Sequence, residues 1–216
     1  MKLTYFGHSA FSLNINDQTL VFDPYNPDLL GIPFPRNVEA DIVLLSHKDP
    51  ETSYTEGVLG YEHLINSPGE YEIADVFIYA LPTFHDDVKG EKLGKNTVFL
   101  IETDQLHILH LGSLGHELSK ETLEKIGRVD VLMIPVGGNY VIDSKKATKV
   151  ISSLEPGIVV PMHYRMPEST YTQDLASVSS FLEEMGVDKD LKPVNSLSLK
   201  AEVPPDAKVV LLKPQH

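Results

Sequence analysis

Alternation between apolar and polar residues dominates the first part of the chain. Residues 2–6, 10–15 and 19–22 follow the period of two that is typical of half-buried strands. A turn at 16–18 separates the second segment from the third, and this spacing predicts antiparallel hairpins. The segment 23–37 contains four prolines and is predicted to be an irregular loop.

The next pattern is the continuous apolar run, which is typical of strands buried on both faces. Such runs occupy 41–45, 129–134 and 157–162. Further strands are predicted at 62–66, 72–80, 97–102, 106–110 and 208–212, with a turn at 67–70.

Helical periodicity appears only in the second part of the chain. A helix is predicted to start near Ser119, a second to span 143–154 with Asp143 as its N-cap, and a third to span 172–185 with Gly186 as its stop. No linker or repeat divides the sequence. We therefore expect a single domain over 1–216, of the α+β class, in which a two-sheet sandwich is covered by helices.

Composition narrows the range of functions. The 216 residues include 31 acidic and 18 basic side chains, a net charge of −13, which disfavours a nucleic-acid partner because phosphate binding needs a basic face. There are no cysteines, so any transition metal must be held by His, Asp or Glu. No stretch approaches the roughly 20 apolar residues needed to span a bilayer. We expect a cytoplasmic protein with no membrane partner, and the oligomeric state stays open.

Histidines recur at the ends of predicted strands. His47, His85, His110 and His163 each end or closely follow an apolar segment. Functional side chains gather at such positions because the strands are rigid and the loops beyond them are free to vary. A single histidine of this kind is more often a hydrogen-bonded rim residue than a ligand, but four of them raise the joint expectation of a site.

Six short motifs, in order along the chain, carry a family resemblance. They are 7–10 (Gly-His-Ser-Ala), 21–24 (Val-Phe-Asp-Pro), 68–72 (Pro-Gly-Glu-Tyr-Glu), 110–112 (His-Leu-Gly), 135–138 (Pro-Val-Gly-Gly) and 161–164 (Pro-Met-His-Tyr). Together they resemble the metallo-β-lactamase superfamily, in the small metal-dependent hydrolase branch that includes the L-ascorbate-6-phosphate lactonases. The resemblance implies a four-layer αβ/βα sandwich with two metals in a cleft at the sheet edges.

The metal motif departs from the family pattern His-x-His-x-Asp-His. The window 47–52 reads His-Lys-Asp-Pro-Glu-Thr, so only its first histidine is kept. His85 and His163 match later family histidines, while Ser113 stands where the family has a bridging aspartate. The two-metal centre is therefore predicted to be degraded, because the bridging carboxylate offsets the repulsion between two cations.

The family resemblance also implies which metal each matching residue of this chain would bind. His47, Asp49 and His85 match the ligands of one metal, and this set suits a single divalent ion such as zinc, manganese or iron. Glu51 and His163 remain for the second metal, which we expect to be absent. Thr52, Ser113, His8 and Asp23 are predicted to line or brace the pocket, and Glu51 is also a candidate general base.

Two functional interpretations follow. In one, the cluster is a metal-free polar network, hydrolysis is weak or absent, and the pocket binds a small-molecule ligand or a protein partner. In the other, the chain is an active mononuclear hydrolase of a small ester, lactone or phosphoester. The adjacent acids Asp86 and Asp87 are interpreted as solvated loop residues rather than as a second metal cluster.

Overall fold

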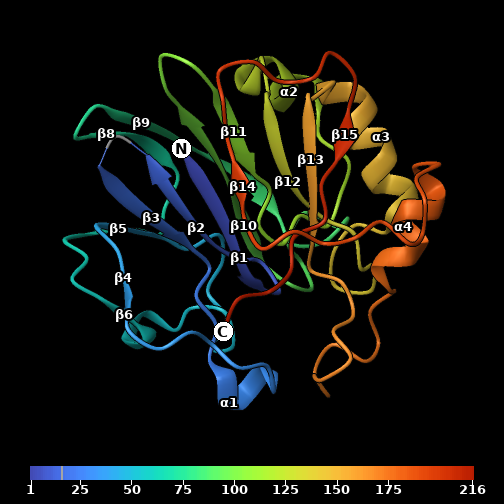
Figure 1. Ribbon diagram of the computed structural model, residues 1–216, viewed down its shortest axis with the longest axis horizontal. Helices are drawn as coiled ribbons and strands as arrows, with labels where there is room; N and C mark the ends of the chain where they lie inside the picture. The colour runs from blue at the N-terminus through green and yellow to red at the C-terminus, as the bar shows by residue number, and fades with distance from the viewer. Residues whose placement is uncertain (16) are drawn as a thin grey trace.

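Two β-sheets pack face to face in the computed structural model (Figure 1). The structure describes residues 1–15 and 17–216, so the part of the predicted 16–18 turn that falls on Asn16 lies outside the described residues. The predicted α+β sandwich is confirmed. In the described part of the chain, no helix has the length and apolar character that crossing a membrane requires.

The first sheet has six strands in the order β14-β1-β2-β3-β5-β7. Its strands are β1 (Lys2–Gly7), β2 (Ala10–Ile15), β3 (Gln18–Phe22), β5 (Ile42–Leu44), β7 (His63–Ile65) and β14 (Leu197–Ser198). β1, β2 and β3 form the predicted antiparallel hairpins, whereas β3, β5 and β7 are parallel to one another.

The second sheet has seven strands in the order β15-β13-β12-β11-β10-β9-β8. Its strands are β8 (Gly69–Ile73), β9 (Val76–Phe84), β10 (Lys95–Glu102), β11 (His107–His110), β12 (Val131–Pro135), β13 (Ile158–Met162) and β15 (Lys208–Val209). The strands β11, β12, β13 and β15 are parallel, and β12 and β13 are buried along their whole length, which explains their continuous apolar runs.

Three helices lie beside the parallel part of the seven-stranded sheet (Figure 1). They are α2 (Lys120–Ile126), α3 (Ser144–Leu154) and α4 (Val178–Glu184). In α3 the side chain of Asp143 accepts a hydrogen bond from the Lys146 amide, as an N-cap should. The helix buries Ala147, Val150, Ile151 and Leu154, whose spacing places them on one face.

A thinner layer covers the outer face of the six-stranded sheet. It contains α1 (Pro27–Leu30), η1 (Thr55–Gly57), β4 (Val38–Glu39) and β6 (Val58–Leu59). A second apolar cluster lies beneath this layer and includes Phe6, Val21, Tyr25 and Leu30. The main core, formed largely between the two sheets, contains Phe11, Phe22 and Phe99. Burial of both sheet faces therefore leaves the strand ends and their loops as the places for a polar site.

Three stretches of the chain differ most from the predicted elements. The strand predicted at 72–80 is broken at Ala74 and Asp75, where β8 turns into β9, and β8 already begins at Gly69 inside the turn predicted at 67–70. Both turn residues have positive φ, 49° and 60°, a conformation usually marked by Asn or Gly. Because Ala-Asp lacks that signature, the pattern did not reveal the turn.

The other two differences concern helices. The loop predicted at 23–37 contains the short helix α1, with Asn26 as its N-cap and Pro27 at its first position. The helix predicted over 172–185 begins only at Val178. Residues before it bond to distant backbone instead, since the Ala176 amide donates to the Gly137 carbonyl and Thr172 Oγ1 accepts from the Met166 amide.

Candidate metal centre

The predicted site residues share one position in the topology. Six of them follow the C-terminal end of a strand by no more than three residues, and Asp49, Glu51 and Thr52 lie further along the loop after β5. His8 follows β1, Asp23 follows β3, His47 follows β5, His85 follows β9, Ser113 follows β11 and His163 follows β13. Strands of both sheets thus bring their polar ends to one edge of the sandwich.

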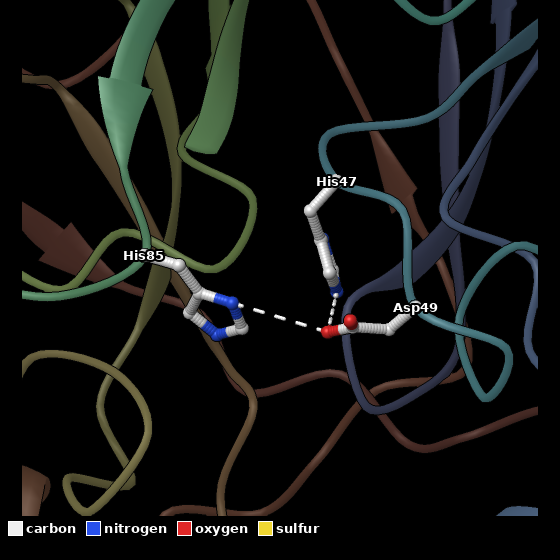
Figure 2. Close-up of side chains that lie close together, drawn as sticks. All are labelled: His47, Asp49 and His85. Carbon is white, nitrogen blue, oxygen red and sulfur yellow. Dashed lines mark ion pairs between the residues drawn. The ribbon is translucent and has the colours of Figure 1, made fainter. Parts of the chain in front are cut away.

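His47, Asp49 and His85 form a compact cluster at this edge (Figure 2). Asp49 Oδ2 lies 3.5 Å from His47 Nε2 and 3.9 Å from His85 Nδ1. One ligand atom from each of the three residues lies within 4.8 Å of the others. A tetrahedral ion with bonds of 2.0–2.1 Å places its ligand atoms roughly 3.3 Å apart, so two of these separations are close to that value.

A tight turn places Asp49 in the cluster. The Thr52 amide donates to the Asp49 carbonyl at 3.1 Å, which closes a four-residue turn with Pro50 at its second position. Aspartate first and proline second is a favoured sequence for such a turn. The turn is tied to the 24–26 loop, since the Asn26 amide donates to the Glu51 carbonyl. The short carboxylate therefore reaches both imidazoles because the backbone folds back toward them.

A hydrogen-bond relay orients the His47 ring. Ser46 Oγ donates to Asp23 Oδ2 at 2.6 Å and lies 2.7 Å from His47 Nδ1. Because a hydroxyl has one hydrogen, Ser46 must accept from His47, which assigns the proton to Nδ1 and a lone pair to Nε2. Asp23 also accepts from the Ser46 amide at 2.7 Å. This arrangement resembles the outer hydrogen bonds that orient histidine ligands of metals.

The donor atoms fit a cation. His47 Nε2, which carries the lone pair, lies 3.5 Å from a carboxylate oxygen of Asp49, and two acceptors at that distance do not stabilise each other without a positive charge between them. Both ring nitrogens of His85 are buried without a hydrogen-bond partner. Buried polar atoms of this kind call for an explanation, and a bound ion is one. Two imidazoles and one carboxylate are suitable ligands for a divalent transition metal.

Two features fix the position of His85. A side chain at Gly115 would collide with the His85 carbonyl, so this close approach requires glycine. Asp86, the next residue, is buried and accepts backbone N–H bonds from Val88, Gly90, Lys92 and Leu93 at 2.7–3.0 Å. Although desolvation raises the pKa of Asp86, these amides outweigh it and lower the pKa to about 2.

The interpretation of Asp86 and Asp87 as solvated residues is therefore wrong for Asp86. Its carboxylate is buried and organises the loop that follows His85, whereas Asp87 remains exposed and pairs with Lys146 at 3.3 Å. Sequence spacing could not show that Asp86 is buried. The backbone amides that donate hydrogen bonds to its carboxylate belong to a loop whose path the sequence does not specify.

His8 and His163 form a second imidazole pair in the lining of the same cavity. Their ring centroids are 3.9 Å apart, and the His163 amide donates to the His8 carbonyl at 2.8 Å. Both residues have φ of 52°, a left-handed conformation that is uncommon outside glycine. His8 Nε2 and His163 Nδ1 are buried without hydrogen-bond partners. Strain together with unpartnered nitrogens is typical of functional positions.

The hydroxyls of Thr52 and Ser113 both lie against the His47 ring. Thr52 Oγ1 lies 2.7 Å from His47 Nε2 and must donate to it, because the His47 proton is on Nδ1. Ser113 Oγ lies 3.5 Å from the same nitrogen. The buried Asn96 holds Ser113 in place, because its side-chain oxygen Oδ1 accepts a hydrogen bond of 2.8 Å from the Ser113 amide. Neutral hydroxyls thus stand where the family pattern has an imidazole and a carboxylate.

Burial keeps these histidines neutral. Desolvation, followed by repulsion from neighbouring imidazoles, lowers the pKa of His8 to about 3 and holds the pKa values of His47 and His163 well below the usual value. Desolvation also lowers the pKa of His85, although the carboxylate of Asp49 opposes it. Neutral imidazole is the form that binds metals.

A cavity of about 230 Å³ collects the predicted residues. Its lining includes His8, His47, Asp49, Glu51, Thr52, His85, Ser113 and His163. Asp23 lies behind this wall, buried against Ser46. Their roles as ligands or as a base stay predictions, and among the residues that the structure describes, His47, Asp49 and His85 are the group of three close enough to share an ion.

Sequence reasoning missed several residues of the site. Leu93, Tyr140 and Tyr171 also line the cavity and are partly exposed at 37–40%. Tyr140 closely follows the glycine pair at 137–138, which is a usable signal, whereas Tyr171 immediately precedes the helix predicted at 172–185 and carries no such signal. Ser46 and Asn96 were missed because their importance depends on hydrogen bonds between distant strands.

Fold and site together define a metallo-β-lactamase-like sandwich with a histidine-rich centre at its edge. A family model described as the β-lactamase superfamily domain matches residues 2–163. This chain belongs to that family.

Relatives and solved structures agree with this assignment. The chain is 28% identical over 214 residues to a metal-dependent hydrolase of Carboxydothermus hydrogenoformans, covering 85% of this chain and 92% of the relative. It is 26% identical over 193 residues to a metal-dependent hydrolase of Thermococcus onnurineus, covering 76% and 84%. A crystal structure of a Thermotoga maritima protein of the metallo-β-lactamase superfamily is 37% identical with a TM-score of 0.79, and the match covers 98% of this chain and 97% of that one.

Proposed function

We propose that this chain is a hydrolase that uses one divalent metal ion held by His47, Asp49 and His85. The main support for this proposal is that the neutral imidazoles of His47 and His85 both approach the carboxylate of Asp49. Both ring nitrogens of His85 are buried without a hydrogen-bond partner. The similarity to metal-dependent hydrolases of Carboxydothermus and Thermococcus supports the same reaction class. The substrate class is a small ester, lactone or phosphoester, which suits the size of the cavity.

The metal would contribute chemistry that the protein lacks. When bound, such an ion lowers the pKa of a coordinated water to about 7 and polarises a carbonyl or phosphoryl oxygen. The chain itself supplies the ligand geometry through the Asp49 turn and the Ser46 relay. Zinc, manganese and iron all suit two imidazoles and one carboxylate.

Other cavity residues can act on the substrate directly. Glu51 is a half-buried carboxylate on the cavity wall and is our candidate to accept a proton from the attacking water. His8 Nε2 and His163 Nδ1 are unpartnered, so each can hydrogen-bond a substrate oxygen or nitrogen. Tyr140 and Tyr171 line the same cavity and are exposed, where their rings can exclude water from a bound substrate.

One metal fits the site better than two. Ser113 supplies a neutral hydroxyl where a bridging carboxylate would have to offset the repulsion between two cations. Thr52 donates its hydroxyl hydrogen toward His47 and adds no negative charge. The expectations of a single ion and of a degraded second site rest on these two substitutions.

A metal-free binding module is the second candidate. It is favoured by the Thr52 hydrogen bond, which already satisfies His47 Nε2 at 2.7 Å. In that case the histidines and carboxylates form a polar network, and the cavity binds a small ligand without hydrolysing it. The unpartnered nitrogens of His85 count against this alternative, because a closed network would have satisfied them.

Metal content distinguishes the two candidates. Protein purified without chelator should contain close to one equivalent of a transition metal by elemental analysis, and it should hydrolyse a simple ester or phosphodiester. His85→Ala and Asp49→Asn should each weaken metal binding by at least about 100-fold, more than the 10–100-fold loss typical of an outer hydrogen-bond partner. His63→Ala, on exposed β7, is the matched control and should have no effect.

Wild-type protein that lacks metal and does not bind zinc, manganese or ferrous iron in titrations would contradict the proposal. The binding module would then be the better account. Two equivalents of metal in the cavity would contradict the single-ion part alone.

A further inference from the structure

A second hollow adjoins the candidate metal centre. It has a volume of about 390 Å³ and shares His47, Asp49 and Leu93 with the site cavity. We call it the lysine groove, after Lys48 and Lys95 in its lining. A substrate whose reacting bond lies at the metal centre can therefore extend into this groove without leaving the protein surface.

We propose that the lysine groove binds an anionic group of the substrate, a carboxylate or a phosphate, through the ammonium groups of Lys48 and Lys95. The inference rests on the proposed hydrolase function and names its substrate class. The substrate would be a small ester or phosphoester that carries a negative charge at the end remote from the bond that is cleaved.

Charge is the first argument. Lys48 follows β5 in one sheet and Lys95 begins β10 in the other, so the two sheets each contribute one cation to the groove. Among the described residues, no ion pair involves either lysine. In a chain with a net charge of −13, two exposed lysines outside any ion pair place positive charge beside the candidate metal centre. The acid that also lines the groove, Asp49, faces the two imidazoles instead.

The remaining lining indicates what lies between the reacting bond and the charge. Pro68, Pro82 and Leu93 give the groove an apolar wall, and Leu93 is 40% exposed. Leu93 belongs to both hollows, so it lies at their junction. A short aliphatic or aromatic spacer fits there, because apolar surfaces favour apolar groups of a ligand while a few polar residues fix its orientation.

The groove is rigid where it meets the centre. The Thr97 amide donates to the Ser46 carbonyl at 2.7 Å, which ties β10 to the loop that carries His47. Asn96, also in the lining, uses its side chain to bond Thr83 and the Leu111 carbonyl. These bonds fix the backbone of both lysines relative to the metal ligands, so that distance can select substrates by length.

Binding is tested first, on metal-depleted protein and without reference to activity. Glutarate and its uncharged analogue glutaramide are titrated against the protein by calorimetry. Glutarate should bind and glutaramide should not. Lys48→Gln and Lys95→Gln should each weaken glutarate binding about threefold and the double variant about tenfold, as expected for exposed ion pairs. Lys200→Gln, beyond β14 at the opposite edge of the six-stranded sheet, is the control of equal charge change and should match wild type.

The sources of the anion are distinguished by a parallel titration with inorganic phosphate. If phosphate binds more tightly than glutarate, the groove binds the phosphate group of phosphorylated substrates. If glutarate binds more tightly, the groove binds the carboxylate group of the substrate. Failure of wild type to bind either anion, or equal binding by wild type and the double variant, overturns the proposal.

Hydrolysis is tested separately on the metal-loaded protein. Mono-4-nitrophenyl glutarate and its methyl ester share the same reacting bond and differ by one negative charge and one methyl group, so the change in their ratio of kcat/KM between variants measures recognition of the anion. The ratio should exceed one for wild type and fall about tenfold in the Lys48→Gln/Lys95→Gln variant. Anion binding without hydrolysis of either ester would leave the groove as proposed and refute the hydrolase function, whereas hydrolysis with an unchanged ratio would refute the groove alone.

Discussion

Ser46 Oγ donates a hydrogen bond of 2.6 Å to Asp23 Oδ2, and this contact links the end of β5 to the end of β3. Both residues are almost fully buried. Desolvation raises the pKa of Asp23 to about 7, and the hydrogen bonds from Ser46 oppose that rise. The same hydroxyl accepts a hydrogen bond from His47 Nδ1. The buried carboxylate of Asp23 therefore orients the ring of the candidate ligand His47 through Ser46.

Ser46→Ala is expected to affect both stability and metal binding. It leaves a hydrogen-bonding atom on each of Asp23 and His47 without its partner, and the free energy of unfolding should fall by about 1–3 kcal/mol. Affinity for the metal should fall by about 10–100-fold because the His47 ring is no longer fixed. Ser12→Ala, at a buried position of β2 outside the site, is the control. Chemical denaturation and metal titration provide the measurements, and unchanged affinity in a folded variant would show that the relay does not orient the ligand.

Restoration of the family ligands should restore a two-metal centre. The changes are Asp49→His, Glu51→Asp, Thr52→His and Ser113→Asp, with replacement of Pro50 as an additional variant because its ring restricts residue 49. We expect the combined variant to bind two zinc ions and to hydrolyse a generic phosphodiester or lactone faster than the native chain. No single change should suffice, because bridging carboxylate and imidazoles act as a unit. A folded variant whose metal content stays at or below one equivalent would show that the cavity itself has been remodelled.

His110 should make the stability of the fold depend on pH. Its Nε2 donates to the Ser9 carbonyl at 2.9 Å and its Nδ1 accepts from the Gly112 amide at 3.1 Å, so the buried ring is neutral. Desolvation lowers its pKa to about 4, although the bond to Ser9 opposes this. The unfolded chain, with a histidine pKa near 6.5, binds the proton more readily. The contribution is therefore fully present above about pH 6.5 and is lost as pH falls toward 4.

His110→Gln tests this linkage. The slope of unfolding free energy against pH between 4 and 6.5 should be smaller in the variant by about 1.4 kcal/mol per pH unit, the value for one proton. Asp23, whose pKa is raised, contributes in the opposite direction, with stability lost as pH rises toward 7. Subtracting the variant's curve from that of wild type removes the Asp23 contribution. Parallel curves would mean that His110 is not neutral in the fold.

Asp86→Asn should loosen the loop beside His85. An amide side chain retains one acceptor oxygen and so loses the bonds that the second carboxylate oxygen takes from the Lys92 and Leu93 amides. Amide exchange over residues 87–94 should accelerate, and the Tm should fall by about 5 °C at this chain length. Asp87→Asn removes only an exposed ion pair and should change the Tm by less than about 2 °C. Equal exchange rates in the two variants would contradict the role given to Asp86.

The sequence determined most of the fold because local periodicity reports burial directly. The buried runs at 129–134 and 157–162 became parallel strands, and Asp143 capped its helix as predicted. The pattern failed where backbone bonds are non-local or the turn chemistry is unusual. The Ala74-Asp75 turn has no glycine, and residues before Val178 bond to distant carbonyls rather than within a helix.

For the site, the sequence by itself determined which residue types are available and that they follow strand ends. Only the tertiary structure decided which of them meet. His47 and His85 belong to different sheets, and their approach to Asp49 depends on how those sheets pack and on a four-residue turn. Asp86, an acid like its neighbour Asp87, is buried only because a loop folds its amides around it. Separations of a few ångströms between distant segments are set by packing of the whole core, and no local pattern of residues encodes them.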